Sequence, residues 1–392
     1  MKSVFKEWFM KILKKIKIVV CLVCLTVVCT LFPACDIQQF FNEFLGDSSS
    51  SSSNPMDVDA YGGAFTEEDI STIKSSDLSI HFPELGNKYT GDCTLIKVGE
   101  TEVLIDAGSR KGSSATLVPY IRQFCTDGVL EYVIATHAHQ DHIAGFIGTN
   151  SADGIFESFE CKTIIDYPLS DATSQVRADY EALRDAEVAS GAEHYTALEC
   201  WNNDNGAQRS YTLADGITMN FLYQKFYEEE TSDENDYSVC MLLTEGENNY
   251  LFTGDLEHEG EESLVESNDL PKCVLFKGGH HGSPTSNTKA LLEKIDPEIV
   301  CVCCCCGSDE YTENVANMFP SQAFVDRVAP YTDKVYVTTI VSDNEDEFES
   351  MNGDIVVMVK DGVVSVRCSN NATLFKDTDW FKENRVCPNA WK

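Results

Sequence analysis

The strongest constraint on the fold of this chain is the run Thr-His-Ala-His-Gln-Asp-His at residues 136–142. Residues 132–135 are apolar, so we predict that a short strand leads directly into this run. A loop that leaves a strand can point several side chains into one cavity. Only eight histidines occur in the chain, and three of them lie between residues 137 and 142. The sequence therefore predicts a metal centre at the end of a strand.

The spacing within this run suits two metal ions. Imidazoles are good ligands for zinc, iron or manganese, and carboxylates favour harder ions. His137 and His139, separated by one residue, can share one metal, and the adjacent Asp141 and His142 can reach a second. Two ions about 3.5–4 Å apart can clamp a substrate oxygen and hold a bridging hydroxide.

Two later segments carry the same residue types at the ends of predicted strands. Residues 251–255 read as a strand that ends at Asp255 after a glycine, where a carboxylate could bridge two metals. Residues 274–283 read as a strand that ends in a glycine-rich turn containing His280 and His281. Glycines let the backbone approach a site closely. Five of the eight histidines thus lie at the ends of two strands.

The order of these motifs resembles the metallo-β-lactamase superfamily, and in particular the hydrolase domain of ComEC-type competence proteins and its free-standing relatives. The likeness covers roughly residues 78–367. Further shared motifs lie on both sides of the histidine run, at residues 91–93, 104–108, 235–238 and 353–355. An ordered series of this kind is more specific than any single motif.

The resemblance implies an α/β fold, the αββα sandwich of the metallo-β-lactamases, with two divalent metal ions at one edge. Zinc is the implied metal, with manganese or iron as alternatives. The implied metal ligands are His137, His139, Asp141, His142, Asp255 and one of His280 and His281, of which we favour His280. Asp255 would bridge the two ions. Asp141 and His281 are the implied catalytic residues, with Asp141 orienting the hydroxide and His281 contacting the substrate.

The chain departs from the family pattern at three places. ComEC-type domains usually have aspartate where this chain has His139. Many family enzymes supply another histidine before the bridging aspartate, whereas this chain has only His194 in that interval. Asn235 and Asp236 are alternatives that could face the site in its place. The family's later His-Pro pair reads Phe-Pro at residues 319–320, which removes one substrate contact.

The N-terminus resembles a bacterial export signal. Six lysines precede an apolar stretch at residues 18–32. This stretch is short for a membrane-spanning helix, which needs about 20 residues, and its length suits a signal peptide. Ala34 and Cys35 follow, so we predict a lipoprotein leader or anchor at residues 1–35. An uncleaved anchor and an ordinary signal peptide are the alternatives. All three place the domain outside the cytoplasmic membrane of a bacterium, either anchored to that membrane or secreted.

The rest of the chain divides into three parts by its composition and by its pattern of predicted strands and helices. Residues 36–76 are polar and serine-rich, which is typical of a flexible linker. Residues 77–370 alternate predicted strands and helices and form the metallo-β-lactamase-fold domain, and residues 371–392 form a C-terminal extension. Within the domain we predict helices at 115–125, 174–191 and 287–295, and a hairpin that turns at Asp361-Gly362.

The cysteine-rich segment at residues 301–306 has a simpler explanation than metal binding. Neighbouring side chains of a strand point to opposite faces, so its five cysteines cannot all converge on one ion. We predict a buried strand of small apolar residues.

The charge of the chain bears on its partners. The formal net charge is −35, and residues 1–34 contain six lysines and one glutamate, so the remainder carries −40. Such a charge repels polyanions, and long nucleic acid is bound through basic surfaces. A nucleic-acid substrate is therefore disfavoured relative to a small molecule or a small phosphodiester.

Three functions are compatible with the sequence. We predict an exported hydrolase that uses a metal-bound hydroxide and acts on phosphodiesters, with nuclease activity as one form of it. The first alternative is hydrolysis of a lactam, a lactone or a wall-polymer phosphoester on the same fold. The second is a non-catalytic surface binding protein, against which the intact set of predicted ligands argues.

Overall fold

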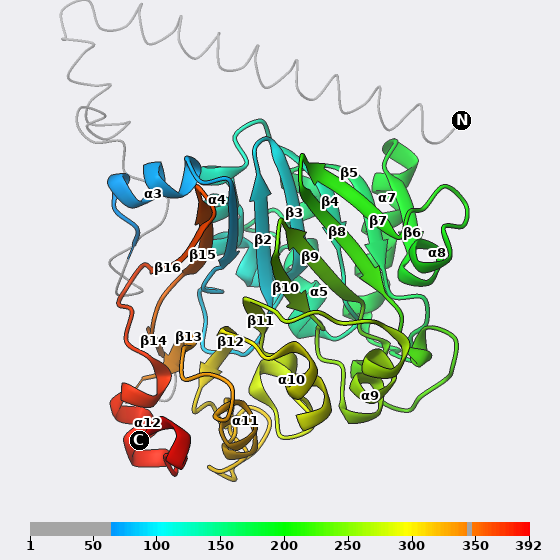
Figure 1. Cartoon of the computed structure of the whole chain (residues 1–392). Helices are drawn as coiled ribbons and strands as arrows, with labels where there is room; N and C mark the ends of the chain where they lie inside the picture. The colour runs from blue at the N-terminus through cyan, green and yellow to red at the C-terminus, as the bar shows by residue number, and fades with distance from the viewer. Residues whose placement is uncertain (1–63, 343–346) are drawn as a thin grey trace, which may run out of the picture. The chain divides into compact units, whose positions relative to one another are not determined.

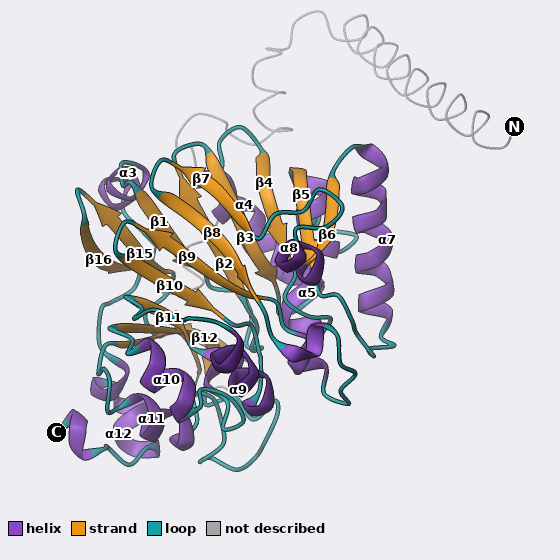
Figure 2. Ribbon diagram, turned by 45° about the vertical axis from the view of Figure 1, so that its right-hand side comes forward, coloured by secondary structure: helices purple, strands orange, loops and turns teal. Residues whose placement is uncertain are grey.

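Two mixed sheets of eight strands each form the centre of the structure, a computed structural model that describes residues 64–342 and 347–392. Helices cover the outer sides of the two sheets (Figures 1 and 2). One cluster of buried apolar residues includes side chains from both sheets, and a second lies between the second sheet and its helices. The predicted αββα sandwich is therefore confirmed.

The first sheet has the strand order β16-β15-β1-β2-β3-β4-β5-β6. Its strands β3 to β6 run parallel, and the others pair antiparallel. The bounds are β1 Leu78–Phe82, β2 Cys93–Val98, β3 Thr101–Ala107, β4 Val129–Ile134, β5 Glu160–Asp166, β6 Glu193–Thr196, β15 Ile355–Lys360 and β16 Val363–Cys368. The predicted hairpin at Asp361-Gly362 joins the last two.

The second sheet has the strand order β14-β13-β12-β11-β10-β9-β8-β7. Strands β10 to β13 are parallel. The bounds are β7 Ser210–Ala214, β8 Ile217–Leu222, β9 Cys240–Glu245, β10 Asn248–Phe252, β11 Leu275–Lys277, β12 Ile299–Cys306, β13 Val335–Val341 and β14 Phe348–Ser350. The carboxyl ends of parallel strands meet at one edge of a sheet, so the loops after β10, β11 and β12 lie together.

The helices begin and end where the sequence supplies capping residues. Ser174 caps the N-terminus of α7, because its side-chain oxygen accepts a hydrogen bond from the backbone N–H of Arg177. Gly191 ends the helix with φ 122°. The predicted helices correspond to α4, α7 and α10. The α-helical bounds are α3 Glu67–Lys74, α4 Ser114–Phe124, α5 Gln140–Ile147, α6 Ile155–Ser158, α7 Gln175–Ser190, α8 Ala197–Asn202, α9 His258–Ser267, α10 Lys289–Ile295, α11 Gln322–Val328 and α12 Asp379–Asn384.

Short 3₁₀ helices connect several of these elements. They are η2 Lys111–Ser113, η3 Lys225–Tyr227, η4 Glu234–Tyr237, η5 Gly279–Gly282, η6 Phe375–Asp377 and η7 Asn389–Trp391.

The ordered structure extends beyond the predicted domain at both ends. Residues 67–74, which we expected in the linker, form α3, because Thr66 and Asp69 cap its N-terminus reciprocally. The C-terminal segment packs onto the second sheet's side of the molecule, where Phe375, Phe381 and Trp391 join the second apolar cluster. The predicted leader and the linker up to residue 63 lie outside the described residues.

Strand β12 contains the cysteine run and is buried along its whole length. Cys301 and Cys303 belong to the first apolar cluster, whereas Cys304 and Cys306 belong to the second. The side chains therefore alternate between the two faces of the sheet, as predicted. Every cysteine of the described residues is a free thiol.

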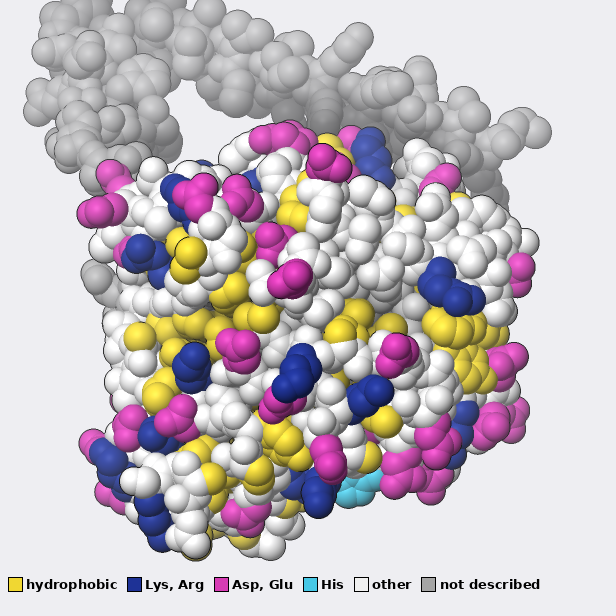
Figure 3. Space-filling model, viewed as in Figure 1, with side chains coloured by type: hydrophobic (Ala, Val, Ile, Leu, Met, Phe, Trp, Pro, Cys, Tyr) yellow, Lys and Arg dark blue, Asp and Glu magenta, His cyan; other side chains and the backbone are white. Residues whose placement is uncertain are grey.

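The surface carries the acidic balance of the sequence. Figure 3 shows Asp and Glu side chains spread over the visible face, interspersed with fewer Lys and Arg. Within residues 64–342 and 347–392, no helix combines the length and the apolar character needed to cross a bilayer.

Candidate metal centre

The histidine run leaves β4 and enters α5, so its side chains lie at the carboxyl end of the first sheet's parallel strands. His139 is the N-cap residue of α5, and Asp141 and His142 are in its first turn. Asp106, at the end of β3, accepts hydrogen bonds from the backbone N–H and the hydroxyl of Thr136, both at 2.8 Å. These bonds fix the backbone at the start of the run.

His142 is held between two carboxylates. Its Nδ1 lies 2.7 Å from Asp106 Oδ2, and its Nε2 lies 3.0 Å from Asp255 Oδ2. The Asp106 contact sets the ring orientation, which leaves Nε2 facing the centre of the site. Asp106 was not predicted as a site residue, although it lies in one of the shared motifs, at residues 104–108.

The turn after β10 brings Asp255 into the site. Gly254 has φ 53°, and a Cβ there would come within 3 Å of Thr136 and Ser238 side-chain atoms. Only glycine therefore allows this close approach. The backbone N–H of Asp255 donates to the hydroxyl of Ser238 at 3.0 Å, which anchors the turn.

The two histidines of the turn after β11 have different surroundings. Both have left-handed backbones, with φ 47° at His280 and 53° at His281. The buried His281 places Nε2 3.1 Å from Asp255 Oδ2 and 3.5 Å from Asp141 Oδ2. His280 is partly exposed, lies 3.9 Å from Asp255 and pairs with Glu257 at 3.3 Å. His281 therefore lies closer to these carboxylates than His280, the residue that we favoured as the metal ligand.

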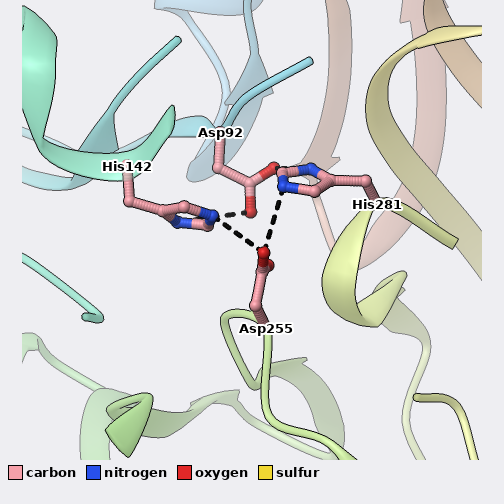
Figure 4. Close-up of side chains that lie close together, drawn as sticks. All are labelled: Asp92, His142, Asp255 and His281. Carbon is pink, nitrogen blue, oxygen red and sulfur yellow. Dashed lines mark hydrogen bonds and ion pairs between the residues drawn. The ribbon is translucent and has the colours of Figure 1, made fainter. Parts of the chain in front are cut away.

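Four buried side chains converge from four different segments. The ligand atoms of Asp92, His142, Asp255 and His281 all lie within 4.8 Å of one another (Figure 4). Asp92 comes from the loop before β2 and was missing from the predicted site, although it lies in one of the shared motifs. Its carboxylate forms an ion pair with the buried ammonium of Lys277, which is also 4.0 Å from Asp255 Oδ1. A lysine in a buried strand is the signal that could have revealed this residue.

Charged neighbours outweigh burial in setting the pKa values of three groups in the site. Burial alone would lower the pKa of His142, but the carboxylates of Asp255 and Asp106 outweigh burial and raise it well above its usual value. The pKa of His281 is raised in the same way by Asp255 and Asp92. Burial would raise the pKa of Asp255, yet the neighbouring imidazoles hold it well below its ordinary value. The Asp255 carboxylate therefore stays charged within the buried site.

Orphaned polar atoms show that these residues fit a metal ion. Asp92 Oδ1, Asp255 Oδ1 and His281 Nε2 are buried and, although they lie in ion pairs, none of them forms a hydrogen bond with the described residues. Buried polar atoms without partners are rare in proteins and indicate a group that binds there. Imidazole and carboxylate donors in this arrangement are the ligand types that zinc and manganese take.

The remaining two histidines of the run form a second group of donors. His139 Nδ1 lies 3.0 Å from His137 Nε2 and 2.8 Å from Asn235 Oδ1. Burial holds the pKa of His137 well below its usual value, so its ring is neutral, as ligation requires. Asn235, one of the two alternatives from the sequence, therefore faces the site. The other alternative, Asp236, instead accepts the backbone N–H of Glu257.

An aromatic pair borders the site. The hydroxyl of Tyr311 donates to Asp141 Oδ2 at 2.7 Å, although Tyr311 was not predicted as a site residue. The Tyr311 ring lies 5.5 Å from that of Phe319, which is 5.9 Å from the rings of both His280 and His281. The residue that replaces the family's later histidine therefore still borders the site.

The other histidines have structural surroundings. His194 pairs with Asp166 at 2.9 Å and is not one of the converging residues. His81 is buried in β1 between the hydroxyls of Tyr120 and Ser79.

Comparison with known proteins supports the assignment of the fold. Residues 86–148, which include Asp92, Asp106 and the histidine run, match the model of the metallo-beta-lactamase superfamily. This match and the αββα architecture show that the described domain has the metallo-β-lactamase fold.

The chain is also similar to part of two bacterial proteins. It is 28% identical over 218 residues to Recombination protein 2 of Haemophilus influenzae, covering 54% of this chain and 23% of that protein. It is 27% identical over 214 residues to Competence protein ComA of Neisseria gonorrhoeae, covering 53% and 25%. The chain thus spans about a quarter of the length of these relatives. The predicted resemblance to ComEC-type proteins is confirmed.

Among solved structures, the metallo-beta-lactamase fold protein YhfI of Bacillus subtilis aligns with 67% of this chain and 96% of its own. The identity is 11% and the TM-score is 0.38.

Proposed function

We propose that the protein is a metal-dependent phosphodiesterase that acts outside the cytoplasmic membrane. The observation that carries the proposal is the buried convergence of Asp92, His142, Asp255 and His281, three of whose polar atoms form no hydrogen bond. Bound divalent metals would supply Lewis acidity toward a phosphoryl oxygen. His142, Asp255, His281 and Asp141 would hold one metal, and His137 and His139 the other.

The protein's own side chains orient the reacting groups. Tyr311 fixes one oxygen of Asp141, and Lys277 fixes Asp92, so both carboxylates keep a single orientation. His280 is the ring that a substrate can reach, because His281 is fully buried whereas His280 is 17% exposed. His280 is oriented by Glu257 and can donate a proton to a leaving oxygen.

The choice of a phosphodiester is supported by the relatives. One is named for recombination, a process on DNA, whose backbone is a phosphodiester. The acidic charge of this chain favours a small phosphodiester over long DNA, because long polyanions are repelled.

Metal analysis and an activity panel on the full-length protein test the proposal. We expect about two equivalents of zinc or manganese per chain, and hydrolysis of bis-p-nitrophenyl phosphate in preference to nitrocefin. His142→Ala should lower kcat/KM at least about 100-fold, because it removes a ligand and the partner of two carboxylates. The matched control His258→Ala changes an exposed histidine on α9 and should leave activity unchanged. Absence of bound metal, or activity on nitrocefin alone, would contradict the proposal.

We also propose that Cys35 is lipid-modified and anchors the protein to the membrane. The lysine-rich start and the apolar stretch at residues 18–32 support this. Mass spectrometry of the mature protein should find a modified Cys35 at the N-terminus. An intact leader with a free Cys35 would contradict lipid anchoring.

A further inference from the structure

We propose that Asn235 is the third protein ligand of the metal position that holds His137 and His139, and that this position binds metal more weakly than the other. The inference rests on the proposed metal centre and goes beyond it, because it assigns an unequal role to its two halves. It concerns the place where the sequence lacks the expected further histidine.

The three donor atoms meet from two loops. His137 Nε2 and Asn235 Oδ1 lie 3.0 Å and 2.8 Å from His139 Nδ1. His137 Nδ1 faces the hydroxyls of Thr136 and Ser238, at 3.2 and 3.4 Å, so Nε2 is the nitrogen that faces the other two donors. Two imidazoles and one amide oxygen thus share one small space.

The surroundings of Asn235 orient its amide oxygen toward that space. Asn235 is 8% exposed and lies in η4. The backbone N–H of Asn235 donates to Asp233 Oδ1 at 3.1 Å, which fixes the first turn of this helix. Its Nδ2 faces the carboxylate of Glu257 at 3.5 Å. Because the amide nitrogen of Asn235 donates to this carboxylate, the amide oxygen of Asn235 points the other way, toward His139. A carbonyl oxygen can coordinate a metal, whereas an amide nitrogen cannot do so readily.

The two halves of the centre differ in charge. The half containing His142 and His281 has the carboxylates of Asp141 and Asp255 within 3.5 Å of the imidazole nitrogens. The other half has two imidazoles and an uncharged amide as its own ligands, and no carboxylate among them. A dication is held more strongly by anionic ligands in a buried site, so the carboxylate half should fill first.

Stepwise metal binding tests the inference directly. Metal-free full-length protein is titrated with Zn²⁺ in competition with a chromophoric chelator, and Co²⁺ spectra report the number of protein ligands. We expect one tight and one weaker equivalent, separated by at least about 10-fold in affinity. Asn235→Ala should weaken only the weaker equivalent, by about 10-fold or more. Asn248→Ala, in the β9–β10 hairpin, is the matched control and should change neither.

A gain-of-affinity variant guards against misfolding as an explanation. Asn235→His supplies an imidazole, a stronger zinc ligand than an amide, and should tighten the weaker equivalent by about 10-fold. Two equivalents of equal affinity in the unaltered protein, or no change in Asn235→Ala, would overturn the inference while the proposed metal centre stands. A protein that binds no Zn²⁺ at all would overturn both.

Discussion

At the scale of single residues, the site depends on side chains that hold the candidate ligands in place. Asp141 lies in the first turn of α5. Its Oδ2 accepts a hydrogen bond from the hydroxyl of Tyr311 and lies 3.5 Å from His281 Nε2. Tyr311 itself comes from the loop after β12, and the preceding Glu310 ties this loop to Arg110 and to the backbone N–H of Thr90. The loop therefore positions a hydroxyl over a carboxylate from a distant part of the chain.

We predict that Tyr311→Phe lowers kcat on bis-p-nitrophenyl phosphate about 3- to 10-fold and changes KM little. The variant removes one hydrogen bond to a charged acceptor, which frees Asp141 to rotate, while the ring keeps its contact with Phe319. Steady-state kinetics with saturating metal measure the effect. Tyr89→Phe, at another partly exposed tyrosine, should behave like the unaltered protein. Equal rates for Tyr311→Phe and the unaltered protein would show that the hydroxyl has no positioning role.

At the scale of elements, β12 shows how cysteines serve as packing residues. Burial raises the pKa of the thiols of Cys303 and Cys305 to about 12 and those of Cys301, Cys304 and Cys306 well above the ordinary value. A thiol reacts as its thiolate, so these residues are protonated and inert at neutral pH.

Alkylation measures this directly. In the native protein at pH 8 we expect iodoacetamide to modify the β12 cysteines at least about 100-fold more slowly than after unfolding in guanidinium. The partly exposed Cys387 is the internal control and should react in the native state. Rapid native labelling of any β12 cysteine, detected by mass spectrometry, would show that the strand opens or that its packing differs.

A pair of buried carboxyl groups joins the β1–β2 loop to the start of β15. The backbone N–H of Glu84 donates to Asp354 Oδ1 at 2.9 Å, and both side chains are buried. Burial, and then the Asp354 charge, raise the pKa of Glu84 to about 9, and burial raises that of Asp354 to about 7. Both groups bind a proton more tightly in the folded than in the unfolded protein.

The sign of the resulting pH dependence follows from linkage. Between about pH 4.5 and 9 the folded state holds protons that the unfolded state releases, so the free energy of unfolding falls as pH rises. Glu84→Gln should flatten this decline by on the order of 1–3 kcal/mol between pH 5 and 9. Urea unfolding at several pH values measures it, with the exposed Glu100→Gln as control. Parallel curves for Glu84→Gln and the unaltered protein would refute the assignment.

At the scale of the whole molecule, the C-terminal segment is an integral part of the domain. Arg385 donates to the backbone carbonyls of Pro320, Val315 and Met318, and Trp391 Nε1 donates to the carbonyl of Thr332. These bonds hold the end of the chain against the loop that carries Phe319 and against the end of α11.

We expect Phe381→Ala to lower the free energy of unfolding by about 3–5 kcal/mol, because Phe381 is 1% exposed within the second apolar cluster. Thermal and urea unfolding of the full-length protein measure the change. Lys382→Ala, at the exposed neighbouring position, should have an effect below about 0.5 kcal/mol. Similar stabilities for the two variants would mean that the segment docks only loosely.

Metal removal should affect the stability of the whole domain. The site joins both sheets, and a metal that binds only the folded state stabilises it by about 2.7 kcal/mol at 100 times its Kd. We expect chelation by EDTA to lower Tm by roughly 5 °C, and added Zn²⁺ to restore it. Differential scanning calorimetry measures the shift, and Asp255→Asn should show a smaller one. An unchanged Tm after verified loss of metal would contradict a metal shared by the two sheets.

From the sequence alone we predicted the fold class, the position of the histidine run at the end of a strand and the packing role of β12. The fold class followed from the resemblance of the ordered motifs to a known family, whereas the other two depend on local periodicity, turn glycines and residue spacing, which act over short stretches of chain. Which of His280 and His281 faces the carboxylates, the ion pair of Asp92 with Lys277 and the contact of Tyr311 with Asp141 were decided only by the tertiary structure. Asp92 and Lys277 are separated by 185 residues, and Tyr311 and Asp141 by 170. Such contacts depend on how two sheets pack, and local patterns carry no information about that.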